Sequence, residues 1–83
     1  MKTIDKEELQ NLSLEDMKQM LENKYVYIYY ENKTIQQGKI KEVNELRRTN
    51  DFGEGYVSKT LYINNVCVDI NVIDHIEVVN LRN

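Results

Sequence analysis

Three tyrosines that alternate along one predicted strand are the first side chains whose type and spacing could do chemistry. Tyr25, Tyr27 and Tyr29 have the period of two that places side chains on one face of a strand. In the register that we favour, Lys39 and Lys41 lie on the same face of the next strand. Aromatic rings beside lysines stack nucleic-acid bases and hold phosphates, and tyrosine is also enriched at protein interfaces. A packed helix or a place at a barrel rim would explain the tyrosines equally well.

The segment 44–55 is the second candidate, and it is the longest connection that the sequence predicts. It holds the only phenylalanine of the chain, Phe52, together with the only Arg-Arg pair, Arg47 and Arg48. Structureless loops near ~12 residues are unusual without a role, and aromatic and arginine side chains often anchor interfaces. We therefore predict that this loop binds a partner. The alternative is a mobile hairpin tip with Phe52 folded back onto the body.

Residues suited to catalysis or metal binding are scarce. Cys67 and His75 are the only cysteine and the only histidine, whereas a structural zinc site needs four ligands, mostly of these two types. A nucleophilic pair would need these two side chains to converge beside an orienting group. Three carboxylate pairs are expected on solvated surfaces or at a turn: Glu7/Glu8, Glu15/Asp16 and Asp69/Asp74. We predict no enzymatic activity, no cofactor and no metal site.

Length and composition set the class of protein. Eighty-three residues fit one domain, since domains average roughly 100–200 residues. Charged residues are 30% and hydrophobic ones 41%, which indicates a globular chain. The net charge of −3 argues weakly against nucleic acid as a partner. One cysteine fits a reducing compartment, and the longest apolar run is far below the ~20 residues of a membrane helix. We expect a cytoplasmic protein without a membrane partner.

The first 23 residues are predicted to be helical. Two capping signals predict a short helical turn and then a helix over roughly 14–22: Asp5 with Glu8, and Ser13 with Asp16. Leu14, Met17 and Leu21 form one apolar stripe along the second helix. A helix of this length is marginal alone in water, so we expect the stripe to be buried on the rest of the chain.

From residue 24 the composition favours strands. Tyr, Val, Ile and Thr become frequent, and five strands are predicted over about 25–30, 35–44, 56–63, 66–72 and 76–80. Asn64-Asn65 predicts a two-residue hairpin. For the first hairpin we prefer a five-residue loop, which places Gly38 and Ile40 with Val26 and Ile28, over a four-residue loop. Gly38 would mark a bend or bulge. The expected outward residues of the third strand are Tyr56, Ser58, Thr60 and Tyr62.

These elements predict a mainly β fold with an N-terminal α-helix. Five short antiparallel strands in about 56 residues suit a small SH3-like or Sm-like barrel, because closure removes the exposed edges of a sheet. The helix would cap one mouth of this barrel. The single domain 1–83 would then consist of a helical segment, 1–23, and a five-stranded barrel, 24–83.

Five segments of the chain, spread over about residues 24–79, resemble the YolD-like family: Val26–Tyr30, Gly38–Val43, Leu61–Ile63, Val68–Ile70 and Ile73–Glu77. That family comprises small bacterial and phage proteins expected to form an Sm-like barrel. The chain departs from it in the long segment 44–55 and in a shorter helical region. The resemblance implies a non-enzymatic cytoplasmic accessory role and supplies no catalytic residues. Its proposed link to damage-tolerance polymerases is not carried over.

The function that we predict is a small non-catalytic protein-interaction module, of the kind encoded by phages or mobile elements. The alternatives are a small nucleic-acid-binding Sm-like barrel and a phage inhibitor of a host nuclease or defence protein. A protein partner is expected and a nucleic-acid partner is disfavoured. The candidate binding residues are Arg47, Arg48 and Phe52 in the loop, and Tyr25, Tyr27, Tyr29, Lys39 and Lys41 on the strand face.

Overall fold

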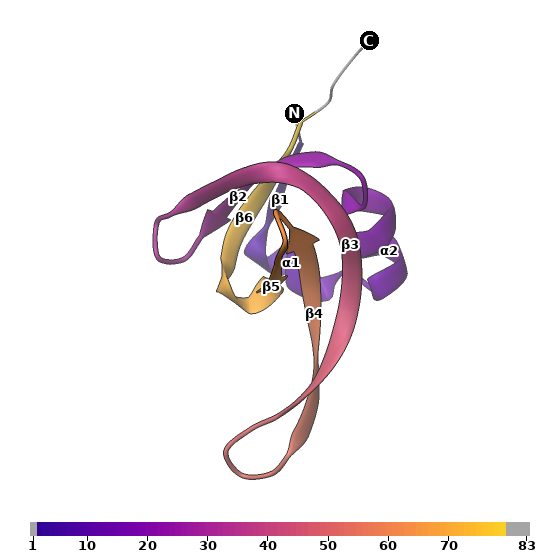
Figure 1. The fold of residues 1–83 in the computed structure, drawn as a ribbon, viewed down its shortest axis with the longest axis vertical. Helices are drawn as coiled ribbons and strands as arrows, with labels where there is room; N and C mark the ends of the chain where they lie inside the picture. Colours follow the sequence, from indigo (N-terminus) through magenta and orange to yellow (C-terminus); the bar gives the residue numbers. More distant parts are fainter. Residues whose placement is uncertain (1, 80–83) are drawn as a thin grey trace.

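One antiparallel sheet of six strands dominates the computed structural model, which describes residues 2–79. The elements run in the order β1 (Lys2–Asp5), α1 (Lys6–Asn11), α2 (Leu14–Leu21), β2 (Tyr25–Tyr30), β3 (Ile35–Thr49), β4 (Gly55–Ile63), β5 (Val66–Asp69), a 3-10 turn (Ile70–Val72) and β6 (Ile73–Val78). In the sheet the strands lie in the order β1-β6-β2-β3-β4-β5 (Figure 1). The N-terminal and C-terminal strands therefore pair with each other at one edge.

Both helices begin at the predicted caps. The Asp5 carboxylate accepts a hydrogen bond from the backbone N–H of Glu8 at 2.8 Å, and the Ser13 hydroxyl accepts one from that of Asp16 at 3.1 Å. Each cap satisfies a backbone donor that has no partner within the helix. Asn23, at a φ of 65°, then turns the chain into β2. The two predicted caps are confirmed.

The core lies between the inner face of the curved sheet and the two helices. Met17 and Leu21 are fully buried, as predicted, and Leu14 is half-buried against them. The N-terminal segment also buries Ile4 of β1 and Leu9 of α1. The other buried apolar residues come from the sheet and the 3-10 turn: Val26, Ile28, Ile40, Val43, Leu61, Ile63, Val68, Ile70, Ile73, Ile76 and Val78.

β3 joins the two halves of the sheet and bends between them. Its first part pairs with β2, with Val26 opposite Gly38, which confirms the five-residue loop. Its second part pairs with β4 after a register shift between Ile40 and Glu42. At Gly38 the Asn64 side chain of the β4–β5 turn lies so close that an added Cβ would be 2.8 Å from its oxygen. Gly38, which was predicted to mark a bend, therefore also leaves the space in which the Asn64 side chain of the β4–β5 hairpin lies.

The predicted five-stranded barrel capped by one helix is wrong. The sheet has a sixth strand, β1, and does not close into a barrel. β1 was missed because Ile4 is its only buried residue, so Lys2–Asp5 has no clear alternation. The predicted fourth strand stops at Asp69, whose carboxylate caps the 3-10 turn at the Asn71 N–H. The last strand starts earlier, at Ile73, and position 80 lies outside the described residues.

The prediction of a loop over 44–55 is also wrong. β3 continues to Thr49 and β4 begins at Gly55, with Thr49 opposite Gly55. Only residues 50–54 form the turn, and the hairpin extends well below the rest of the molecule in Figure 1. Alternation was hard to recognise there because both faces of this hairpin are exposed. Within residues 2–79 the longest helix has eight residues, too few to cross a membrane.

Candidate functional site

The tyrosine face, defined as Tyr25, Tyr27 and Tyr29 on the outer side of β2, is open to solvent. The side chains between them, Val26 and Ile28, point inward and are fully buried in the core that the helices cover. The tyrosines themselves are half-buried. A helix packed on this face is therefore excluded as the explanation for the stripe, and the rim of a closed barrel fails because the sheet is open.

Contacts with β6 hold Tyr29 in place. Its ring stacks on that of His75, with centroids 4.2 Å apart and planes within 11°. A hydrogen bond with Glu77 is the main reason that the pKa of Tyr29 is raised. His75 Nδ1 lies 2.7 Å from the Asp74 carboxylate and lowers the pKa of Asp74. The carboxylates of Asp74 and Glu77 thus give this end of the tyrosine face an acidic border.

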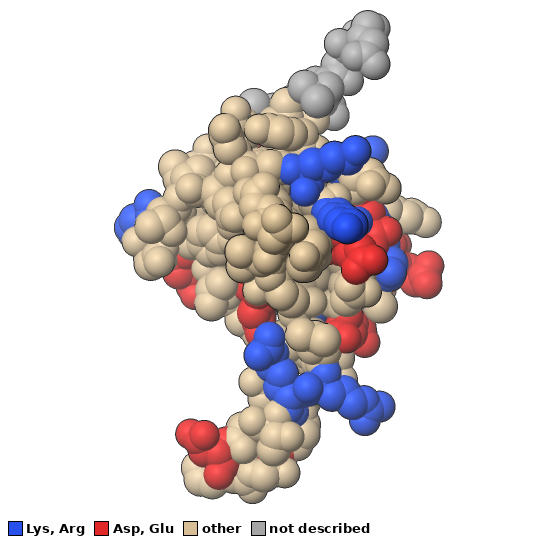
Figure 2. All heavy atoms as spheres, viewed as in Figure 1, with Lys and Arg blue, Asp and Glu red and all other residues tan. Residues whose placement is uncertain are grey.

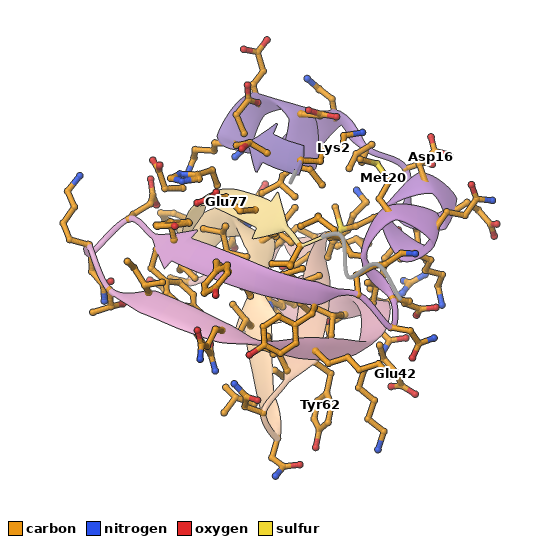
Figure 3. The ribbon with its side chains drawn as sticks, turned by 90° about the horizontal axis from the view of Figure 1, so that it is seen from above. Lys2, Asp16, Met20, Glu42, Tyr62 and Glu77 are labelled. Atoms are coloured by element: carbon orange, nitrogen blue, oxygen red, sulfur yellow. The ribbon has the colours of Figure 1, made fainter. Side chains whose placement is uncertain are left out.

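The other end of the tyrosine face continues across β3 onto β4. Lys39 lies opposite Tyr25 in the register, and the Lys41 ammonium is 5.9 Å from the centroid of the Tyr62 ring. Figure 3 shows Tyr62 pointing away from the helices. The structure therefore brings the two predicted lysines next to aromatic rings. Tyr62, an expected outward residue, is an addition to the candidate site, and Glu42 is its cross-strand neighbour.

The arm, defined as residues 45–59, is a two-stranded ribbon that projects from the sheet. β2 pairs with β3 only as far as Lys39, and β5 pairs with β4 only from Thr60 onward. Along the arm, β3 and β4 pair only with each other, and no other described strand pairs with either of them there. A two-stranded hairpin without a covered face is marginally stable in water. Nonetheless this arm exposes four large apolar side chains: Leu46, Phe52, Tyr56 and Val57.

The turn at the arm tip is ordered by one side chain. The side-chain amide oxygen of Asn50, Oδ1, accepts hydrogen bonds from the backbone N–H groups of Phe52 and Glu54, each at 2.9 Å. Gly53 adopts a φ of +77°, which glycine takes without steric cost. Phe52 is 87% exposed on this turn. It does not fold back onto the body, so that alternative is wrong.

The two arginines of the arm have different surroundings. They point to opposite faces of the ribbon because they are adjacent in a strand. Arg48 Nε lies 3.5 Å from the Asp69 carboxylate, and the same carboxylate oxygen accepts a hydrogen bond from the Ser58 hydroxyl at 2.5 Å. Arg48 therefore fastens the base of the arm to β5. Beneath it Ser58 is buried, as is Thr60, although both were expected to face outward.

Charge is segregated along the arm. Its middle and base carry three cations, Arg47, Arg48 and Lys59, and one carboxylate, Glu45, which lies opposite Lys59, whereas its tip carries Asp51 and Glu54. In Figure 2 the blue side chains cross the shaft of the hairpin and the red ones lie at its end. A shallow hollow of about 400 Å³ lies between the shaft and the tip and is lined by Arg47, Arg48, Thr49, Gly55, Tyr56 and Val57.

The remaining reactive side chains do not assemble. Cys67 is exposed on β5, and His75 is on β6, so three strands separate them in the sheet order. Asp69 caps the 3-10 turn, in line with its expected place at a turn, and Asp74 contacts His75. Among residues 2–79, no three side chains of the His, Cys, Asp and Glu types gather as a metal site would require.

No family model, curated protein or solved structure matches this chain. The resemblance to the YolD-like family therefore stays a prediction.

Proposed function

We propose that this chain is a non-catalytic protein-interaction module and that the arm is its binding element. The observation that carries the proposal is the exposure of Phe52, 87%, at the end of a ribbon that projects from the body. Leu46, Tyr56 and Val57 add exposed apolar surface along the same ribbon. Single exposed apolar side chains are normal on a protein surface, but four large ones on one short projecting element favour a role in interaction. Aromatic residues and arginines are the most frequent interface anchors.

The order of the tip supports this role. Association costs the conformational freedom of the side chains and loops that become fixed. The two hydrogen bonds to the Asn50 side chain already hold the backbone on which Phe52 stands. The arm therefore presents its aromatic side chain at a lower entropic cost than an unstructured loop of the same length would.

We expect Phe52→Ala to remove binding of the protein partner and to leave folding unchanged. The ring buries almost no surface in the folded chain, so the free energy of unfolding should change by less than about 0.5 kcal/mol. The measurement is affinity capture from a lysate of the producing cell, treated with nuclease, alongside thermal melting of the purified variants.

Val66→Ala is the matched control for this experiment. Val66 is 50% exposed in β5 and lies outside the arm, so its truncation should leave capture intact. A large fall in melting temperature for Phe52→Ala would mean that the ring packs in the core. Equal capture by wild type and Phe52→Ala would remove the arm as the binding element.

A single-stranded nucleic acid on the tyrosine face is the second candidate function. Its supporting observation is that Tyr25 and Tyr62 lie open beside Lys39 and Lys41. The carboxylates bordering this surface and the net charge of −3 oppose it. We therefore expect no binding of oligo(dT) or oligo(U) in fluorescence anisotropy at physiological salt. Micromolar binding that weakens steeply with salt, as counterion release demands, and that Lys39→Ala/Lys41→Ala abolishes, would reverse this ranking.

A further inference from the structure

We propose that the partner protein binds by adding a β-strand of its own to the free edge of β3 along the arm, over residues 44–49. This inference rests on the proposed function, because it names the binding mode and the partner segment for the same element. In strand addition, backbone hydrogen bonds supply affinity and alternate side chains supply specificity.

The pairing of β3 with β4 determines which backbone groups of the arm point away from it. The Asn50 N–H donates to the Glu54 carbonyl at 2.9 Å, so these two residues form a hydrogen-bonded pair. In an antiparallel ladder such pairs alternate with pairs whose N–H and C=O groups point outward. The register is continuous along the arm. The outward groups on the β3 edge therefore belong to Glu45, Arg47 and Thr49.

Val43 supports this alternation and shows where the free edge begins. It lies two positions before Glu45 and therefore also points its N–H outward, and that N–H donates to the Glu22 carboxylate at 2.9 Å. A group that covers an exposed edge in this way blocks pairing with another chain. Beyond Val43, residues 44–49 are all exposed, and no strand within residues 2–79 pairs with this side of them. One N–H and one C=O from each outward residue are therefore available to a further strand.

The opposite edge of the arm, on β4, is shorter. Its outward groups belong to Gly55 and Val57, the partners of outward residues of β3. The next residue, Ser58, is buried, and its hydroxyl donates to the Asp69 carboxylate at the end of β5. A strand on this edge would therefore meet β5 beyond Val57. The β3 edge is the better site for a partner strand because its free stretch is longer.

The side chains along the β3 edge specify the partner strand. Arg47 lies between Glu45 and Thr49 on one face, and Leu46, which is 41% exposed, lies on the other. Opposite charges directly across a strand pair stabilise it, and like charges destabilise it. The partner strand therefore carries an acidic residue opposite Arg47, an apolar one opposite Leu46 and a basic one opposite Glu45. In antiparallel order, the more stable pairing, this pattern reads acidic, apolar, basic.

A second copy of this chain contains that pattern in residues 45–47 but fits the edge poorly. Antiparallel pairing of two β3 edges about Leu46 would place Thr49 of one copy opposite Val43 of the other. The outward N–H of Val43 is already bonded to Glu22, which ends α2. The tip of each arm would therefore meet this residue in the other copy. An extended segment of a different protein meets no such obstacle if it ends before Val43.

NMR titration of the isotope-labelled full chain with the blocked peptide Thr-Thr-Glu-Val-Lys-Thr-Thr tests the proposal. The amides of Glu45, Arg47 and Thr49 should shift and exchange more slowly with solvent on binding, whereas those of Gly55 and Val57 should not change. A control peptide with Lys-Val-Lys at its centre should bind at least about fivefold more weakly, because a lysine then faces Arg47 in either strand direction.

Two proline substitutions on opposite edges of the arm form a matched pair. Thr49→Pro and Gly55→Pro each remove an outward N–H and none of the hydrogen bonds between β3 and β4, so both variants should fold, as circular dichroism would show. Thr49→Pro should abolish binding of the peptide and Phe52-dependent capture of the partner. Gly55→Pro should preserve both.

Unchanged amides of Glu45, Arg47 and Thr49 at millimolar peptide would overturn the proposal, as would equal loss of binding in the two proline variants. A dimer in analytical ultracentrifugation that Thr49→Pro dissociates would place a second copy on this edge instead. Capture that requires Phe52 but tolerates Thr49→Pro would contradict this inference and leave the proposed function standing.

Discussion

Deletion of residues 1–23 should leave the remaining chain unfolded. The segment contributes four fully buried side chains, Ile4, Leu9, Met17 and Leu21, to a core of fifteen residues. The deletion also removes β1, which pairs along the whole of its length with β6. Chains of this size bury little surface in excess of what folding requires, so a loss of this extent exceeds the stability of the domain.

Point substitutions in α2 test whether its buried side chains stabilise the folded domain. Leu21→Ala should lower the free energy of unfolding by about 2–4 kcal/mol, because the side chain is fully buried and leaves a cavity. Leu14→Ala, on the same helix but half-buried, should cost clearly less. Urea denaturation followed by circular dichroism measures both. If the deleted chain melted at the wild-type temperature, the helices would be a separate binding element rather than part of the core.

Gly38→Ala should have the second largest effect, a loss of about 1–3 kcal/mol by overpacking. An added Cβ would lie 2.8 Å from Asn64 Oδ1. The Asn64 side chain cannot move aside freely, because its amide donates a hydrogen bond to the Gln37 carbonyl at 2.9 Å. The φ of +157° at Gly38 is also one that residues with a Cβ rarely adopt. The same urea denaturation measures this variant.

Gly55→Ala is the control for this substitution. Its added Cβ would have only the Arg48 carbonyl oxygen near it, at 4.0 Å, so the variant should be as stable as wild type. Asn64→Gly in the Gly38→Ala background should recover part of the loss, since it removes the clashing side chain and suits the φ of 51° at that position. Wild-type stability of Gly38→Ala alone would show that the two hairpins can separate at little cost.

Effects that act over a few residues were readable from the sequence. The caps at Asp5 and Ser13 each involve a residue only three positions away. The Asn64-Asn65 turn depends on positive φ values that asparagine tolerates locally. The five-residue loop follows from the register that places Gly38 and Ile40 with Val26 and Ile28. The outward direction of the tyrosines follows from the period of two in β2, whose two faces differ in polarity.

Only the tertiary structure decided how distant segments pair. Nothing local in Lys2–Asp5 specifies a strand, and its partner β6 lies more than 65 residues away. The arm was read as a loop because an exposed ribbon has no buried face to impose alternation. The contact of Arg48 with Asp69, which buries Ser58, joins three strands and leaves no local signal. Local patterns specified single elements, whereas the open sheet and the projecting arm arise from packing between elements far apart in the chain.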